Sequence, residues 1–318
     1  MSHAPLTYRL GSPGPIPPLA ELGGKGRQLA ELASLRYHVP PGFVVMATAF
    51  REFCAGDSVL TDLVGRPPES DALDASARID RFADGLRRAC EAAPMPPLLE
   101  ASLLYAFDAL AAERVAVRSS YASEDGAVQS YAGQFESILN VGRDTLLDAV
   151  RRCWSSVFAA RAITYDGGAY WRDPAGAGFA VVVQEMVNAS VSGVCFTKHP
   201  TTGDGRVLFI EAVWGMGEAH VSGQVSPDTY VLQKDSLAVT EHIRSLQSRM
   251  LVPAPGAGLQ WVEVPSARQH AEKIGTDALH ELARLGCDLE LVMGYPCDIE
   301  WALGQGQIHT LQCRPITT

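Results

Sequence analysis

The stretch CDIEWALGQGQIHTLQCR (residues 297–314) contains the most informative local pattern of the chain. Polar and apolar residues alternate on both sides of Gly304-Gln305-Gly306, which predicts a β-hairpin closed by a three-residue turn. In that register Asp298 faces Gln312 and Glu300 faces Thr310, while Ile308 departs from the alternation. The polar residues would then share one face of the hairpin, and they are Asp298, Glu300, Thr310, Gln312 and Arg314.

Two carboxylates, an amide oxygen and a guanidinium on one face suit a metal-bound polyphosphate better than they suit a core. Mg²⁺ takes hard oxygen ligands, and arginine contacts phosphates. The alternative is a solvated sheet face with one cross-strand ion pair. The pattern favours the metal and phosphate interpretation.

A second motif, Leu22-Gly23-Gly24-Lys25-Gly26, stands where the chain enters a segment whose leucines recur at helical spacing. Glycines at such a point let backbone N–H groups approach a phosphate, and a helix N-terminus favours negative charge. Lys25 adds a mobile cation. The motif is not a Walker A sequence, because Lys25 is followed by Gly26 rather than by Ser or Thr. The alternative is a glycine-rich helix cap with an exposed lysine.

Arg118 ends a strand-like run and precedes a hydroxyl-rich loop over residues 119–134. Its guanidinium suits a pair of phosphate oxygens, although a surface loop with a rim salt bridge fits equally well. The apolar run 179–183 predicts a buried strand that ends in Gln184 and Glu185. Backbone groups and an apolar wall there would suit a flat heterocycle, whereas a core strand that reaches the surface is the alternative.

Composition narrows the class of protein. Of the 318 residues, 47% are apolar, which excludes a disordered chain, and a net charge of -10 argues against nucleic acid or an anionic membrane as the main partner. The seven cysteines form no C-x-x-C pair, so we expect free thiols in a reducing compartment. No secretory signal and no membrane-spanning run is visible, and we therefore expect a soluble, cytoplasmic protein.

The element pattern divides the chain into two lobes, residues 1–187 and 188–318. In the first lobe we expect helices over 19–35 and 51–113 and strands at 43–46 and 115–118. In the second lobe short strands dominate, and one helix is expected over 267–285. A histidine that carries a phosphoryl group needs an exposed ring, usually in a mobile Gly- or Ser-rich loop. The sequence contexts of His199 and His220 fit this requirement poorly, and we interpret them as ordinary surface or hydrogen-bonded histidines rather than as phosphoryl carriers.

Taken in order, these pieces resemble the N-terminal nucleotide-binding part of the phosphoenolpyruvate synthase and pyruvate phosphate dikinase family, which includes the rifampin phosphotransferases. The resemblance spans nearly the whole chain. The matching stretches are LGGKGRQLAEL (22–32), VPPGFVV (39–45), VAVRSSYASEDG (115–126), YAGQFESILNV (131–141), VVQEMV (182–187), SGVCFTKHPTTG (192–203), EAVWGMGEAHVSGQVSPDTY (211–230), CDIEW (297–301) and LQCRP (311–315).

The resemblance implies an α+β protein with the ATP-grasp fold, in which two lobes hold ATP between them. It also implies that ATP is split to AMP and phosphate while the β-phosphoryl group passes to a histidine on a swinging domain. On this chain, Lys25, Arg118 and Arg314 match the polyphosphate contacts and catalytic residues.

The other residues implied by the resemblance serve the metal and the nucleotide. Glu300 and Gln312 match the ligands of Mg²⁺ (or Mn²⁺), with Asp298 beside them. Gly133 lies in the loop that covers the phosphates. The adenine-binding junction corresponds to Gln184, Glu185, Met186 and Val187.

The chain also departs from the family pattern. Tyr121 replaces a small residue, and Lys198-His199 replaces a more variable pair. No histidine lies in a segment like the family's carrier loop, so we expect a partner protein or domain that bears the phosphorylated histidine and the small-molecule acceptor. A split enzyme of the phenylphosphate synthase type, with a phenol as acceptor, fits this pattern. The alternatives are an ATP-sensing module without turnover and a piece of a longer phosphoenolpyruvate synthase or rifampin phosphotransferase.

Overall fold

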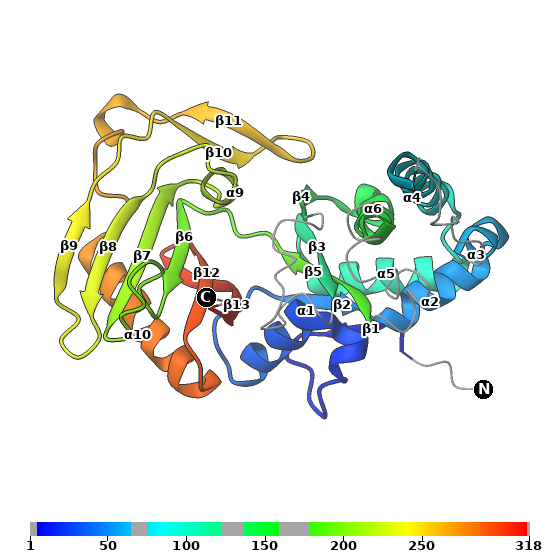
Figure 1. Cartoon of the computed structure of the whole chain (residues 1–318), viewed down its shortest axis with the longest axis horizontal. Coiled ribbons are helices and arrows are strands. Elements are labelled where there is room, and N and C mark those ends of the chain that lie inside the picture. The colour runs from blue at the N-terminus through cyan, green and yellow to red at the C-terminus, as the bar shows by residue number, and fades with distance from the viewer. Residues whose placement is uncertain (1–4, 65–74, 122–136, 159–177, 317–318) are drawn as a thin grey trace. The chain divides into compact units, whose positions relative to one another are not determined.

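The computed structural model describes residues 5–64, 75–121, 137–158 and 178–316. It contains helices and antiparallel sheets, which confirms the predicted α+β class. The chain divides into two compact units (Figure 1). The first unit comprises Met1–Ser34 and Pro41–Met186, and the second comprises Leu35–Pro40 and Val187–Thr318.

The first unit contains a five-stranded antiparallel sheet in the order β1-β2-β5-β3-β4. The apolar run predicted as a buried strand forms the central strand, β5, and six of its seven residues are buried. The strands are β1 (Thr7–Arg9), β2 (Gly42–Val45), β3 (Val115–Tyr121), β4 (Ser137–Val141) and β5 (Phe179–Glu185). Sequence patterning missed β1 and β4, which are short edge strands.

Helices cover both faces of this sheet. On one face lies a core in which the rings of Phe53 and Trp154 are 4.8 Å apart. Alternate strand residues such as Val44 point to the other face. Helix α1 packs there, as shown by the 3.1 Å that would separate a Cβ on Gly26 from the Val44 side chain. The helices are α1 (Leu19–Ser34), α2 (Ala47–Gly56), α3 (Ser58–Val64), α4 (Ala75–Ala92), α5 (Pro97–Leu110) and α6 (Leu146–Ser155), with short 3₁₀ turns at Arg143–Thr145 and Ser156–Phe158.

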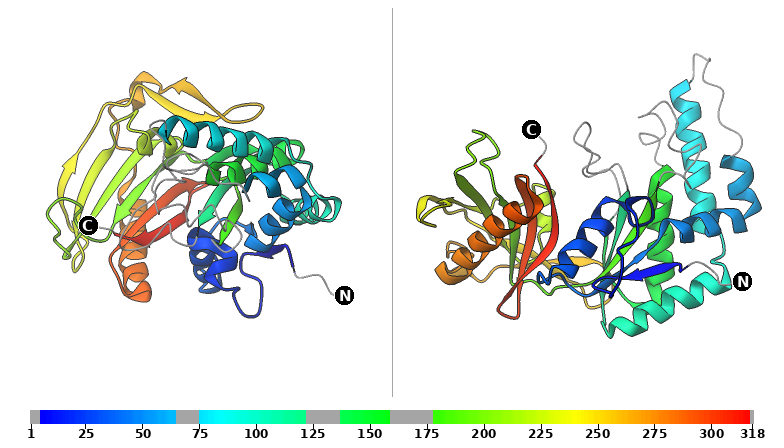
Figure 2. Two further views of the ribbon diagram at one scale, coloured as in Figure 1. Left: turned by 45° about the vertical axis from the view of Figure 1, so that its right-hand side comes forward. Right: turned by 90° about the horizontal axis from the view of Figure 1, so that it is seen from below.

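The second unit contains a six-stranded antiparallel sheet in the order β13-β12-β6-β7-β8-β9 and a separate hairpin, β10-β11. Helix α10 lies along one face of this sheet (Figure 2), where Gly286 allows it to approach Cys195 closely. The strands are β6 (Val191–Phe196), β7 (Val207–Trp214), β8 (Asp228–Gln233), β9 (Val239–Ile243), β10 (Arg249–Pro253), β11 (Leu259–Glu263), β12 (Cys297–Gly304) and β13 (Gln307–Pro315).

Helix α10 runs from Thr276 to Met293, so the prediction of a helix over residues 267–285 was wrong at both ends. Gly275 is extended and precedes the first turn, and Gly294 adopts a left-handed conformation just past the last turn. Residues 266–268 form only a short 3₁₀ turn. The other helix of this unit, α9 (Glu218–Val221), is a single turn.

A fully buried ion pair, Lys273 with Asp228, lies in the second unit outside the β12-β13 hairpin. Lys273 Nζ lies 2.5 Å from Asp228 Oδ1 and donates to the carbonyl of Ser245 at 2.8 Å. The backbone N–H groups of Ser245 and Lys273 also donate to the Asp228 carboxylate. The pair therefore fastens two connecting segments to β8.

All seven cysteines are free thiols; Cys54 and Cys287 are partly exposed and the others are buried. Burial, together with the charge of Asp57, raises the pKa of Cys54 to about 12. Within the described ranges, none of the helices combines the length and apolar character needed to cross a bilayer.

Candidate functional site

The glycine motif of the first unit forms a kink in α1, directly after the first turn of the helix. Gly23 has φ 66° and ψ 176°, and a Cβ there would lie 2.1 Å from the carbonyl oxygen of Ser120. Only glycine fits both this backbone conformation and this contact. The Ser120 hydroxyl accepts a hydrogen bond from the Gly26 N–H (2.9 Å) and donates one to the Leu22 carbonyl (2.8 Å).

Arg118 lies two residues before Ser120 on β3, so both side chains point to the face of the sheet on which α1 packs. Lys25 and Arg118 are each half-buried. Lys25 thus lies within the turn Leu22–Gly26, and Arg118 lies two residues before the serine that contacts this turn. Gly133 lies outside the described residues. Tyr121 points to the opposite face and is buried in the aromatic core, with its ring 6.5 Å from that of Phe179.

The predicted adenine-binding segment lies at the end of β5. Gln184 is buried and pairs with Gly42 and Ala116. The N–H of Glu185 donates to Pro41 O at 2.7 Å, and the N–H of Met186 donates to Arg114 O at 3.0 Å. The backbone donors of Glu185 and Met186 are therefore satisfied within the protein, and Val187 belongs to the second unit.

The C-terminal hairpin forms, but the predicted register was wrong. Gln305 (φ 51°) and Gly306 (φ 78°) make a two-residue turn, so Gly304 pairs with Gln307. A bulge between Glu300 and Trp301 shifts the pairing once more. As a result the observed pairs are Asp298 with Arg314, Glu300 with Gln312 and Trp301 with Thr310.

The two shifts restore four of the five predicted polar residues to one face. Thr310 moves to the apolar face with Trp301 and is buried, and Ile308 joins it opposite Leu303. The polar face carries Asp298, Glu300, Gln312 and Arg314 and is turned away from α10, which packs on the other face.

Asp298 and Arg314 form a charged pair on this face. Nε and Nη2 of Arg314 lie 2.9 and 2.8 Å from Oδ2 of Asp298. Burial raises the pKa of Asp298, and the charge of Arg314 only partly opposes this effect. The other carboxylate oxygen, Oδ1, is buried and has no hydrogen-bond partner among the described residues. A buried carboxylate oxygen without a partner fits a bound cation, because a polar atom left unsatisfied in a protein interior is costly.

The protein side chains alone do not complete a metal site. In the described part of the chain, no three His, Cys, Asp or Glu side chains converge as metal ligands. Mg²⁺ is usually held by one or two carboxylates together with substrate phosphates and water. The pair Glu300 and Gln312, with Asp298 beside it, is consistent with such a partial ligand set.

Sequence reasoning missed Glu211 as a member of this face. Glu300 pairs with Val194, which pairs with Glu211 on the next strand, so the two carboxylates share a face across three strands. His220 Nε2 lies 3.0 Å from Glu211 Oε2. The available signal was a single charged residue within the apolar run VLFIEAVW (207–214).

The histidines behave as interpreted from the sequence. Nδ1 of His199 accepts N–H groups of Thr201 (3.2 Å) and Thr202 (3.3 Å), which places the ring proton on Nε2. Its ring lies 5.0 Å from that of Phe209. His199 is therefore a structural element of its loop, and His220 is a hydrogen-bonded partner of Glu211.

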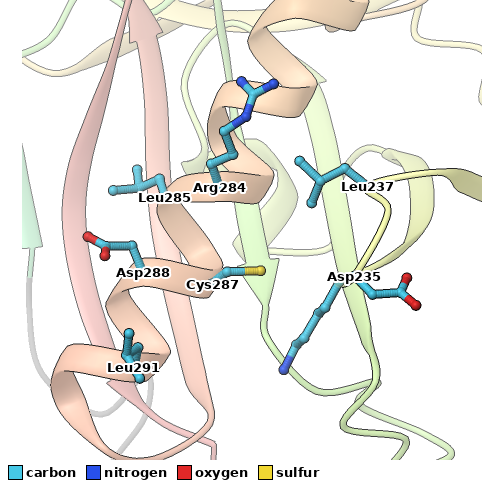
Figure 3. Close-up of a pocket in the computed structure, with 8 residues that line it drawn as sticks. Asp235, Leu237, Arg284, Leu285, Cys287, Asp288 and Leu291 are labelled. Carbon is cyan, nitrogen blue, oxygen red and sulfur yellow. The ribbon is translucent and has the colours of Figure 1, made fainter.

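A separate hollow of about 700 Å³ lies between α10 and the turn that follows β8 (Figure 3). It contains none of the predicted site residues. Its Lys234 pairs with Glu290, a partly exposed ion pair. The lining residues are Lys234, Asp235, Leu237, Arg284, Leu285, Cys287, Asp288 and Leu291.

Comparison with known proteins assigns the chain to a family. Residues 19–318 match the family described as pyruvate phosphate dikinase, AMP/ATP-binding domain, and the chain belongs to this family. A probable phosphoenolpyruvate synthase of Methanocaldococcus jannaschii is 36% identical over 93% of this chain and 25% of that protein. A rifampicin phosphotransferase of a Streptomyces species is 38% identical over 94% of this chain and 35% of that protein.

The phosphoenolpyruvate synthase of Pyrococcus furiosus is 32% identical over 93% of this chain and 42% of that protein. The chain thus spans between a quarter and less than half of the length of these relatives. Among solved structures, D-alanyl-alanine synthetase A of Vibrio cholerae is similar over 76% of this chain and 56% of that one, with 11% identity and a TM-score of 0.32.

Proposed function

We propose that this chain is the ATP-binding component of a dikinase-type phosphotransferase. In this proposal residues 1–187 and 188–318 are the two lobes of an ATP-grasp fold. ATP is split to AMP and phosphate, and the β-phosphoryl group passes to a histidine on a partner protein or domain. That partner would then phosphorylate a small acceptor, for which we favour a phenol.

The observation that carries the proposal is the polar face of the β12-β13 hairpin. It sets Glu300 opposite Gln312 and leaves a buried carboxylate oxygen of Asp298 without a protein partner. Membership of an AMP/ATP-binding family supports the nucleotide as the ligand.

Each group has a role that its chemistry supports. Glu300 and Gln312 would hold Mg²⁺ or Mn²⁺, with Asp298 beside them. When bound, the metal would neutralise the charge that develops on the transferring phosphoryl group. Lys25 and Arg118 would bind and orient the polyphosphate from the first unit, and Arg314 would do so from the hairpin.

A neighbouring carboxylate holds one of these cations, Arg314, in position. Asp298 orients the Arg314 guanidinium through contacts of 2.9 and 2.8 Å. The Gly133 loop would cover the phosphates, and the segment Gln184–Val187 would bind adenine through groups other than the two satisfied N–H donors.

Calorimetric titration with ATP in the presence and absence of Mg²⁺ tests this proposal. We expect saturable, Mg²⁺-dependent binding of ATP to the wild-type chain. Arg118→Ala should weaken binding on the order of a hundredfold, because it removes a charge-assisted contact worth about 2–3 kcal/mol. A matched control is Arg206→Ala, since the Arg206 side chain is 86% exposed and forms its ion pair with Asp204 in its own loop. A folded wild-type chain that binds no ATP would refute the proposal.

A further inference from the structure

The hydroxyl of Ser120 occupies the place of a helical hydrogen bond at the kink of α1. In a regular helix the N–H of Gly26 would donate to the carbonyl of Leu22, four residues earlier. Here the N–H donates to Ser120 Oγ at 2.9 Å, and the same oxygen donates to Leu22 O at 2.8 Å. The side chain is thus inserted into the backbone ladder, which is a recognised cause of helix distortion.

This insertion coincides with the one residue of α1 that has non-helical backbone angles. Gly23 (φ 66°, ψ 176°) lies within the interval that the Ser120 hydroxyl bridges. Its backbone passes so close to Ser120 that a Cβ would overlap the Ser120 carbonyl. The close approach of the Ser120 backbone therefore requires glycine at position 23. The Ser120 hydroxyl holds the opened turn on both sides of Gly23, through Leu22 and Gly26.

The bridge is buried, which makes it a strong constraint. Ser120 and Leu22 are fully buried, and the hydroxyl uses its single donor on the turn. Without the hydroxyl, the Gly26 N–H and the Leu22 carbonyl would lose their partners or would have to close on each other. Either change displaces Lys25, the residue directly before Gly26.

The turn is anchored independently on its other flank. The Glu21 carboxylate accepts the N–H and the hydroxyl of Thr48, at 3.0 and 2.8 Å, and also contacts Arg51. These contacts fix the entry to the turn at the N-terminus of α2. Ser120 is thus the anchor that acts on the turn itself.

We propose that Ser120 is a positioning residue for nucleotide binding: its hydroxyl keeps the turn Leu22–Gly26 open and thereby sets the position of Lys25. This inference rests on the proposed function, because it concerns the same phosphate contacts. Ser120 acts through the turn and not by contact with the nucleotide.

A double-mutant cycle tests the inference. The dissociation constant for Mg–ATP is measured by calorimetry for the wild type, Ser120→Ala, Lys25→Ala and the double variant. We expect Ser120→Ala to weaken binding about tenfold, but less than about twofold when Lys25 is already absent, since residues that act through one another are not additive. A purely structural role would give equal losses in both backgrounds.

Ser156→Ala is the matched control. Ser156 is a buried serine of the same unit whose hydroxyl donates to the carbonyl of Cys153 at 2.6 Å, within its own turn. It should lower thermal stability without changing ATP affinity. If Ser120→Ala does not fold, Ser120→Cys, which keeps a weaker donor and acceptor, is used in the same cycle with a smaller expected loss.

Two results would overturn the inference: ATP affinity within twofold of the wild type for the folded Ser120 variant, or losses that multiply in the double variant. Failure of the proposed function gives a different result, since the wild type and Ser156→Ala would then also bind no Mg–ATP.

Discussion

In the first unit the turn Leu22–Gly26 is held by the neutral hydroxyl of Ser120, whereas in the second unit Arg314 is held by the charge of Asp298. A neutral anchor fixes geometry without opposing the positive charge of Lys25 and Arg118. The hairpin instead sets one cation among two carboxylates, those of Asp298 and Glu300. In the proposed function, its polar face would attract phosphate only after a cation has bound.

The two units also differ in what stabilises them. The first unit is built around an aromatic core that includes Phe50, Phe53 and Trp154. The second fastens its connecting segments to β8 through the buried pair of Lys273 and Asp228. The comparison therefore predicts that Mg²⁺ dependence resides in the hairpin and that charge substitutions destabilise the second unit most.

The largest expected effect is on the buried ion pair. Lys273→Met leaves the Asp228 charge buried and unpaired, which should cost about 3–5 kcal/mol of unfolding free energy. Urea unfolding measures it. Lys234→Met is the matched control, because its pair with Glu290 is partly exposed and should cost less than about 1 kcal/mol. Equal losses for the two variants would contradict the role given to the buried pair.

A second test compares the glycines of the two motifs. Gly23→Ala forces a Cβ against the Ser120 carbonyl in a left-handed conformation, and should cost about 3 kcal/mol and weaken ATP binding. Gly306→Ala shares the positive φ but meets nothing within 4 Å, so about 1–2 kcal/mol is expected. Thermal unfolding and calorimetry measure both effects. A larger loss of unfolding free energy in Gly306→Ala than in Gly23→Ala would show that the contact with the Ser120 carbonyl does not determine the cost at Gly23.

A third test separates charge from metal. Arg118→Ala should weaken ATP binding on the order of a hundredfold at every Mg²⁺ concentration. Glu300→Gln should instead raise the Mg²⁺ concentration needed for half-maximal binding about tenfold or more, because it removes a ligand charge. Titrations of ATP over a series of Mg²⁺ concentrations distinguish the two responses. An unchanged Mg²⁺ requirement in Glu300→Gln would remove the metal assignment.

The smallest effect concerns pH. Burial favours a higher pKa for Glu21, but hydrogen bonds from Arg51 and Thr48 outweigh it and lower the pKa below its ordinary value of 4.5. The unfolded chain therefore binds this proton more tightly, so the stabilisation is complete above about pH 4.5 and is lost as the pH falls through the lowered value. The unfolding free energy of Glu21→Gln should therefore fall less than that of the wild type between neutral and acidic pH.

Urea unfolding at neutral and acidic pH measures this difference. Glu52→Gln, a change at an exposed position of α2, is the control and should keep the wild-type pH dependence. A Glu21 variant as pH-sensitive as the wild type would show that its hydrogen bonds do not stabilise the fold.

The sequence predicted elements whose signal is local. The run FAVVVQE gives β5 because continuous apolar residues suit a strand buried on both faces. The helix at Leu19–Ser34 follows from leucine spacing. The α10 boundaries were missed because its start and end are set by the backbone angles of Gly275 and Gly294, which the apolar period does not report.

At the C-terminal hairpin, the sequence pattern predicted part of the site. The polar face was predicted, but its pairs were not, because a two-residue turn and a bulge each shift the register by one residue. The departure of Ile308 from the alternation was the available signal for this shift. The lone charge of Glu211 in an apolar run was a sequence signal, but it does not point to Glu300. The relations of Glu211 to Glu300 and of Ser120 to Gly26 arise only when distant segments pair.

The most direct test is a crystal structure of the chain with Mg²⁺ and a non-hydrolysable ATP analogue. We predict a metal ion bound by Glu300 and Gln312, with the polyphosphate in contact with Lys25, Arg118 and Arg314. A nucleotide bound elsewhere, with those five side chains untouched, would contradict the proposed function.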